Sequence, residues 1–175
     1  MQAPQYRIDW DRIEAAITAN TRLLILNSPH NPTGMVMDED DIAALSALCA
    51  KNDIYLIGDE VYEHMVFDQA KHLSLCAYED LYSRSFVISS FGKTYHVTGW
   101  KVGYCIAPPA LTKEFRRVHQ YVTFTVNTPV QLGIAEFLQH HPEHHQCLPS
   151  FYQAKRDLFC ELLKGSRFTV SPSQG

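Results

Sequence analysis

Two short, uninterrupted apolar runs, at residues 23–26 and 54–57, constrain the fold more than any other feature of the sequence. Such runs are typical of strands that are buried on both faces of a parallel sheet. The second run begins about thirty residues after the first, which is the length of one strand–helix–strand unit. Asp38 can cap a helix between them, whose apolar residues recur at helical spacing from Ile42 onward. We therefore expect two neighbouring parallel strands joined by a right-handed crossover.

The rest of the chain continues this alternation. Apolar segments at residues 86–88 and 102–107 predict a third and a fourth strand. A first helix is expected after Asp9, and a last helix, with its apolar residues on one face, is expected to end near Gly165. The sequence therefore predicts an α/β fold with a mostly parallel sheet and flanking helices.

Composition and charge exclude several classes of protein. Hydrophobic residues make up 46% of the 175 residues and charged residues 19%, which is ordinary for a globular chain. The formal net charge of -4 argues against nucleic acid as a partner. No apolar run approaches the roughly 20 residues of a membrane span. The five cysteines include no Cys-x-x-Cys pair and the N-terminal residues no apolar signal segment, so we expect a cytoplasmic protein with reduced thiols.

Polar side chains follow the first three predicted strands, at the sheet edge where open α/β folds bind ligands. Asn31 follows the first strand, Asp59 and Tyr62 the second, and Ser90 and Lys93 the third. The predicted sheet thus brings an amide, a carboxylate, a phenol, a hydroxyl and an amine to one edge. Turn and capping roles explain Asn31 and Ser90 well, but they explain Lys93 and Tyr62 poorly.

The lysine of this group admits two kinds of chemistry. Gly92-Lys93-Thr94 resembles the end of a phosphate-binding P-loop, but that motif needs a glycine where Val87 stands. The other possibility is a Schiff base with the aldehyde of pyridoxal phosphate (PLP). PLP needs an acid partner for its ring nitrogen, a donor for its phenolate oxygen, and hydroxyls and cations for its phosphate. The residues of suitable type are Asp59, Tyr62, Ser90, Lys93 and Lys101.

Four segments resemble, in order and approximate spacing, those of the class I and II aminotransferases, which are fold-type I PLP enzymes. They are residues 31–34, 59–62, 89–94 and 98–103. The chain is most similar to the branch that acts on methionine, kynurenine and other large amino acids. The resemblance implies a central fragment of the family chain. Its parts would be the central portion of the large PLP-binding domain at residues 1–141, and an interdomain helix and the start of a truncated small domain at residues 142–175.

The resemblance also implies a role for each residue that matches a family position. Lys93 would hold PLP as a Schiff base and would then move a proton between the substrate Cα and the cofactor. Asp59 would pair with the pyridinium nitrogen of the ring. Tyr62 and Asn31 would donate to its phenolate oxygen.

Two further residues match the phosphate-binding positions of the family. Ser90 stands three residues before Lys93, and Lys101 stands eight residues after it. Many members have an arginine at the second position, where a lysine offers a point charge instead of a bidentate fork. The resemblance thus implies that Ser90 and Lys101 bind the phosphate.

The function implied by the resemblance is the exchange of an amino group between a large amino acid and a 2-oxo acid, in a homodimer. One alternative is a PLP-dependent C–S β-lyase, although such lyases often have a histidine where this chain has Tyr62. Another is a catalytically incomplete fragment, because the family's N-terminal and C-terminal portions supply further groups of the site.

A run of histidines at residues 140–145 is the other candidate for chemistry. Histidines four residues apart on a helix can chelate a metal. Pro142 is expected at a helix start, where it separates these pairs. We therefore expect a solvated connection here and no metal site.

Overall fold

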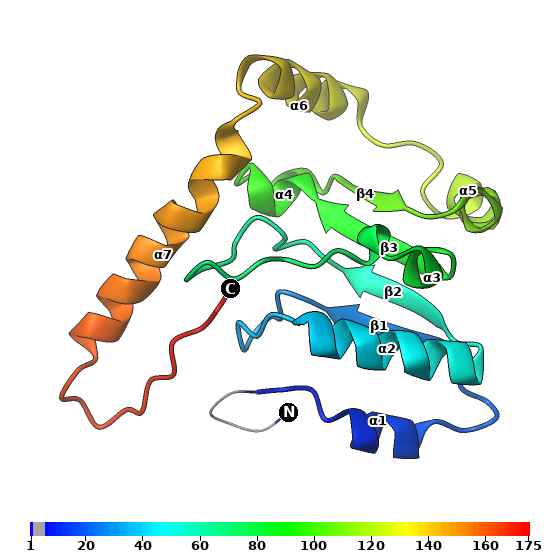
Figure 1. The fold of residues 1–175 in the computed structure, drawn as a ribbon. Coiled ribbons are helices and arrows are strands. Elements are labelled where there is room, and N and C mark those ends of the chain that lie inside the picture. The colour runs from blue at the N-terminus through cyan, green and yellow to red at the C-terminus, as the bar shows by residue number, and fades with distance from the viewer. Residues whose placement is uncertain (2–5) are drawn as a thin grey trace.

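A four-stranded sheet lies at the centre of the computed structural model, which describes Met1 and residues 6–175 (Figure 1). The strands lie in the order β1-β2-β3-β4, with β1 to β3 parallel and β4 antiparallel to β3. The predicted α/β fold with a mostly parallel sheet is confirmed. The strands are β1 (Leu23–Asn27), β2 (Tyr55–Asp59), β3 (Ser85–Ser90) and β4 (Gly103–Ile106).

Helices connect and flank these strands. α1 begins after Asp9, whose carboxylate accepts a hydrogen bond from the Arg12 amide, as the sequence predicts. No helix of the described residues is both long and apolar enough to span a membrane. The helices are α1 (Trp10–Ala16), α2 (Glu39–Asn52), α3 (Glu79–Tyr82), α4 (Phe91–Thr94), α5 (Pro109–Val122), α6 (Thr128–His140) and α7 (His144–Leu162), with the short 3-10 helices η1 (Leu75–Ala77) and η2 (Thr98–Trp100).

α2 forms the crossover between β1 and β2, and its first turn is held by a capping box. The Asp38 carboxylate accepts a hydrogen bond from the Asp41 amide at 3.0 Å, and the Asp41 carboxylate accepts one from the Asp38 amide at 3.2 Å. Two orphan amides of the helix start are thereby satisfied. The Asp41 amide, and after it Arg7, hold the pKa of Asp38 below its ordinary value. The predicted cap at Asp38 is confirmed.

Only one face of the sheet is packed against the core of the described chain. Leu56 and Val87 belong to a buried cluster that includes residues of α2, α3 and η1, among them Leu45. On the opposite face the side chains of Leu23 and Ile25 are 44% and 65% exposed. The expectation of strands buried on both faces is therefore wrong for this chain. The uninterrupted apolar runs reflect two apolar faces, of which the crossover α2 covers one.

The last helix also differs from its prediction. α7 begins at His144 and ends at Leu162, before Gly165, which has a left-handed φ of 75° three residues beyond the helix. Its predicted apolar face lies in solvent, since Phe159 and Leu162 are 61% and 73% exposed. The amphipathic pattern thus predicted the helix, but nothing among the described residues covers this face.

We predict that Asp38→Ala lowers the free energy of unfolding by about 1 kcal/mol at neutral pH, the usual contribution of an N-cap. Because the folded-state pKa of Asp38 lies below its ordinary value of 3.8, this stabilisation is present above that value and disappears as the pH falls through the folded-state pKa. Urea unfolding between neutral and strongly acidic pH measures the difference. The matched control is Asp40→Ala, which removes an acidic side chain of the same turn that caps nothing. Equal losses in the two variants, or a loss independent of pH, would contradict the role of Asp38.

Candidate functional site

The carboxyl ends of β1 and β2 are joined through Asn27. This residue is the register partner of Asp59, and its Nδ2 donates to the Asp59 carbonyl at 2.9 Å. Its Oδ1 accepts a hydrogen bond from the Asn31 amide at 2.7 Å. The sheet therefore places Asp59 and Asn31 at the same edge, through an asparagine that sequence reasoning did not single out.

Tyr62 and Lys93 face each other at this edge. The Lys93 Nζ lies 5.5 Å from the centroid of the Tyr62 ring, a distance at which the ring face attracts an ammonium group. Tyr62 and Asn31 also line a common cavity of about 260 Å³, whose wall includes Gly175. An amine, a phenol and an amide thus lie around the end of β2, which carries Asp59.

Ser90 ends β3 and caps α4, the short helix that carries Lys93. Its Oγ accepts a hydrogen bond from the Gly92 amide at 3.1 Å. A Cβ on Gly92 would lie 3.0 Å from the Thr98 Cα and 3.1 Å from the Ser90 Oγ, so a larger residue would force the turn to shift. The capping role expected as the simpler explanation of Ser90 is therefore present. This cap holds the short connection from β3 to Lys93, which is closely packed at Gly92.

Lys101 precedes β4, the strand that pairs with the end of β3 where Ser90 stands. Gly103 is the register partner of Ser90, and the Ser90 Oγ lies 3.5 Å from the Val102 carbonyl. Lys101 therefore stands two residues from the partner of Ser90, and it remains exposed. Its φ of 57° is left-handed, a conformation that is costly for a residue with a Cβ and that its surroundings must enforce.

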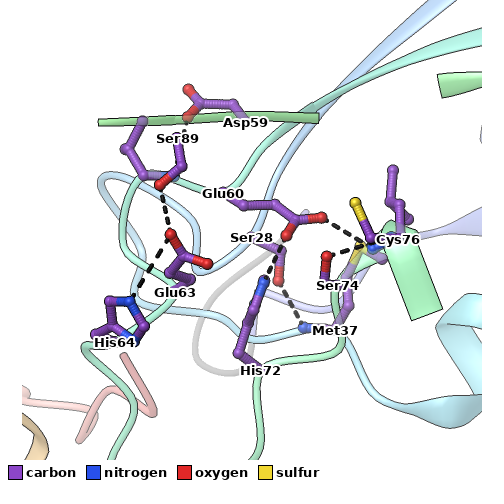
Figure 2. Close-up of polar contacts among 12 residues, drawn as sticks. Ser28, Met37, Asp59, Glu60, Glu63, His64, His72, Ser74, Cys76 and Ser89 are labelled. Carbon is purple, nitrogen blue, oxygen red and sulfur yellow. Dashed lines mark hydrogen bonds and ion pairs between the residues drawn. The ribbon is translucent and has the colours of Figure 1, made fainter. Parts of the chain in front are cut away.

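The carboxylate of Glu63, one residue after Tyr62, connects the loop after β2 to two strands, and Figure 2 shows its contact with Ser89. Its Oε1 accepts hydrogen bonds from the Ser89 Oγ at 2.5 Å and from the Tyr104 hydroxyl at 2.9 Å. The loop that carries Tyr62 is thereby tied to β3 and β4. Burial, together with the Glu63 carboxylate, raises the pKa of Tyr104 to about 12. Sequence reasoning missed this contact because no local spacing relates residues 63 and 104.

A second carboxylate, that of Glu60, points to the buried side of the same loop. It accepts hydrogen bonds from the His72 Nε2 at 2.8 Å, which Figure 2 shows, and from the Leu75 amide at 2.9 Å. Ligand atoms of Glu60, Glu63 and His72 lie within 4.8 Å of one another, which is close enough for a metal ion. Both Glu60 oxygens already accept protein hydrogen bonds, so the packing of this group is explained without a cation.

The histidine run is divided between two helices. α6 ends at His140 and α7 begins at His144, so the expected interruption is present. The expectation of a solvated connection holds for exposed His140 and His141, but it is wrong for His144 and His145, which are half-buried. The His144 Nε2 lies 3.0 Å from the Thr94 carbonyl at the end of α4, so α7 packs against the helix that carries Lys93.

Comparisons with known proteins identify relatives of the whole chain. The family model described as "Aminotransferase class I and II" matches residues 1–175. The chain is 49% identical to methionine aminotransferase of Escherichia coli (strain K12) over 175 residues, which cover 100% of this chain and 45% of that protein. It is 35% identical to human kynurenine–oxoglutarate transaminase 3 over 166 residues, 91% of this chain and 37% of that protein. The chain thus spans about half or less of the length of these curated relatives.

Solved structures agree with these relationships. A crystal structure of an E. coli protein with a methionine aminotransferase function superimposes with a TM-score of 0.95 at 49% identity, covering 99% of this chain and 46% of that one. The aspartate aminotransferase of Thermus thermophilus with maleate superimposes with a TM-score of 0.86 at 29% identity, covering 96% of this chain and 44% of that one. The arrangement of strands and helices is therefore that of PLP-dependent aminotransferases, present in part.

We predict that Glu63→Gln lowers the pKa of Tyr104 from about 12 but leaves it above the ordinary value of 10.0, because burial, the larger cause, remains. NMR titration of isotope-labelled tyrosine measures the change. Glu161→Gln, on exposed α7, is the matched control and should leave Tyr104 unaltered. Ordinary titration of Tyr104 in the parent, or no response to Glu63→Gln, would show that the contact is absent in solution.

Proposed function

The chain belongs to the class I and II aminotransferases, and on this premise we propose that it serves the exchange of an amino group between an amino acid and a 2-oxo acid. The observation that carries this proposal is the position of Lys93. Its amine lies 5.5 Å from the centroid of the Tyr62 ring, on a turn held by Ser90, at the sheet edge that presents Asp59. An amine in such a place can bind an aldehyde and can then act as a positioned base.

The residues at this edge fit PLP by the chemistry of their donors. The Asp59 carboxylate can hold the proton of a ring nitrogen, and Tyr62 and Asn31 can donate to a phenolate oxygen. Ser90 is the register partner of Gly103, which stands two residues after Lys101, and a hydroxyl and a cation are groups suited to a phosphate. When bound, PLP supplies the aldehyde and an electron-accepting ring. These assignments follow the family positions that the chain matches.

Lys93 would carry the proton of the reaction. Its amine would accept a proton from the substrate Cα and deliver it to the cofactor, and accepting that proton requires the uncharged form of the amine. The Tyr62 ring lies close enough to orient the amine through its electron-rich face. Asp59 would pair with the ring nitrogen, because a carboxylate beside that nitrogen favours its protonated form.

The substrates we propose are a large amino acid, such as methionine or an aromatic one, and a 2-oxo acid. The printed names of the relatives, methionine aminotransferase and kynurenine–oxoglutarate transaminase, support this class. We further propose a cytoplasmic homodimer, in which residues 1–141 belong to the PLP-binding domain and residues 142–175 lead into a small domain. The relatives are longer than this chain, so groups from outside residues 1–175 would complete the site.

We predict that incubation with PLP, followed by borohydride reduction and peptide mapping, places the cofactor on Lys93. Lys93→Ala should abolish this label and all turnover, while Lys113→Ala on exposed α5 should retain both. Asp59→Asn should bind PLP about tenfold or more weakly, because a charge-assisted hydrogen bond is lost. Labels spread over several lysines and unaffected by Lys93→Ala would refute the assignment. Specific labelling of Lys93 without turnover would identify a catalytically incomplete piece.

We also predict which PLP reaction follows. With methionine and a 2-oxo acid, the protein loaded with PLP and not treated with borohydride should form the new amino acid. With a cysteine conjugate and no 2-oxo acid, it should release little pyruvate. Pyruvate release at a rate equal to or above that of amino transfer would instead assign the protein to the C–S β-lyases.

A further inference from the structure

Glu60 follows Asp59 directly, at the point where β2 ends. Because successive side chains of a strand point to opposite faces, the Glu60 carboxylate lies on the buried side when Asp59 faces the other way. Glu60 is only 4% exposed. A carboxylate at this depth is costly unless hydrogen bonds compensate it, and here the His72 Nε2 and the Leu75 amide each donate one.

The hydrogen bonding of His72 indicates which of its nitrogens carries the proton. The side chain of His72 is 10% exposed, its Nε2 lies 2.8 Å from Glu60, and its Nδ1 is buried with no hydrogen-bond partner among the described residues. Because an ionised carboxylate can only accept, the His72 Nε2 is assigned as the donor of this hydrogen bond.

The segment that carries His72 is packed closely against β2. A Cβ on Gly58 would lie 2.8 Å from the Cδ1 of Leu75 and 3.5 Å from the Oε1 of Glu60. The Leu75 amide and side chain thus both contact the end of the strand. The segment of residues 72–75 cannot move without displacing Glu60 or opening this contact.

The main chain at Asp59 and Glu60 is anchored to both neighbouring strands. On the β1 side, the Asp59 carbonyl accepts hydrogen bonds from the Ser28 amide at 3.1 Å and from the Asn27 side chain. On the β3 side, the Glu60 amide donates to the Ile88 carbonyl at 2.8 Å. The Asp59 Oδ1 also accepts a hydrogen bond from the Val61 amide at 3.4 Å, and the buried Glu60 side chain holds the residue that lies between these two.

We propose that Glu60 and His72 form a positioning pair that fixes the direction of the Asp59 carboxylate. The resemblance assigns no role to either residue, although Glu60 lies in segment 59–62. The proposal rests on the proposed function, since Asp59 is to hold the ring nitrogen of PLP. His72 donates to Glu60, Glu60 holds the end of β2, and Asp59 is thereby presented to the ligand in one orientation.

The test is a double-mutant cycle on PLP affinity in the protein that contains this chain. His72→Phe keeps a ring of similar size and removes the donor, and Asp59→Asn removes the charge through which the pair should act. His72→Phe should raise the Kd for PLP about tenfold in the parent background, and less than about twofold in the Asp59→Asn background. Equal factors in the two backgrounds would show a merely structural role and overturn the proposal.

Two further variants distinguish loss of the hydrogen-bond donor at His72 from a change in the size of its side chain. His72→Gln restores an N–H donor and should return the Kd to within about threefold of the parent. His140→Phe, a matched change at an exposed histidine that ends α6, should leave the Kd unaltered. A Kd for His72→Gln as high as that of His72→Phe would show that donation to Glu60 is not what matters.

A measurement without PLP distinguishes failure of this pair from failure of the proposed function. Hydrogen exchange of the Leu75 amide should be at least about tenfold faster in His72→Phe than in the parent, because this amide donates to the Glu60 carboxylate that His72 helps to hold. Unchanged exchange would overturn the positioning pair whether or not PLP binds. If the parent binds no PLP while exchange responds as expected, the proposed function fails, and with it the role of the pair toward the ligand.

Discussion

The parallel pairing of β1, β2 and β3 is the constraint on which the site depends. In a parallel sheet all carboxyl ends meet at one edge, so the residues that follow three different strands become neighbours. The register aligns Asn27 with Asp59 and Asp59 with Ile88, two residues before Ser90. A shift of one residue would turn Asp59 to the buried face, because side chains alternate along a strand. The chemistry of this edge therefore requires this register.

Hydrogen bonds of side chains near this edge hold the segments that carry Asp59, Tyr62 and Lys93. Glu60 fastens the end of β2 to the buried segment of His72, while Glu63 fastens the next turn to β3 and β4. Lys93 is held from the other side by the Ser90 cap and by α7, which touches the end of α4. Two carboxylates thus hold the segments that carry Asp59 and Tyr62.

The sequence could predict whatever depends on local pattern. The strands, the cap at Asp38 and the gathering of polar residues after β1, β2 and β3 follow from apolar runs and turn chemistry, and the structure contains them. The pairs of Glu60 with His72 and of Glu63 with Tyr104 could not be predicted, because each joins residues with no shared periodicity. Exposure of Ile25 and Leu162 was also beyond prediction, since apolar pattern shows what can be buried and not what covers it.

The proposed function requires that this edge bind PLP with its ring nitrogen against Asp59. A crystal structure of the protein with PLP bound tests it most directly, through the distance from the Asp59 carboxylate to the ring nitrogen. We predict a hydrogen bond of about 2.7–3.2 Å between the Asp59 carboxylate and the ring nitrogen, with the Lys93 amine joined to the cofactor aldehyde. A ring nitrogen that faces another group, or PLP bound away from Lys93, would contradict it.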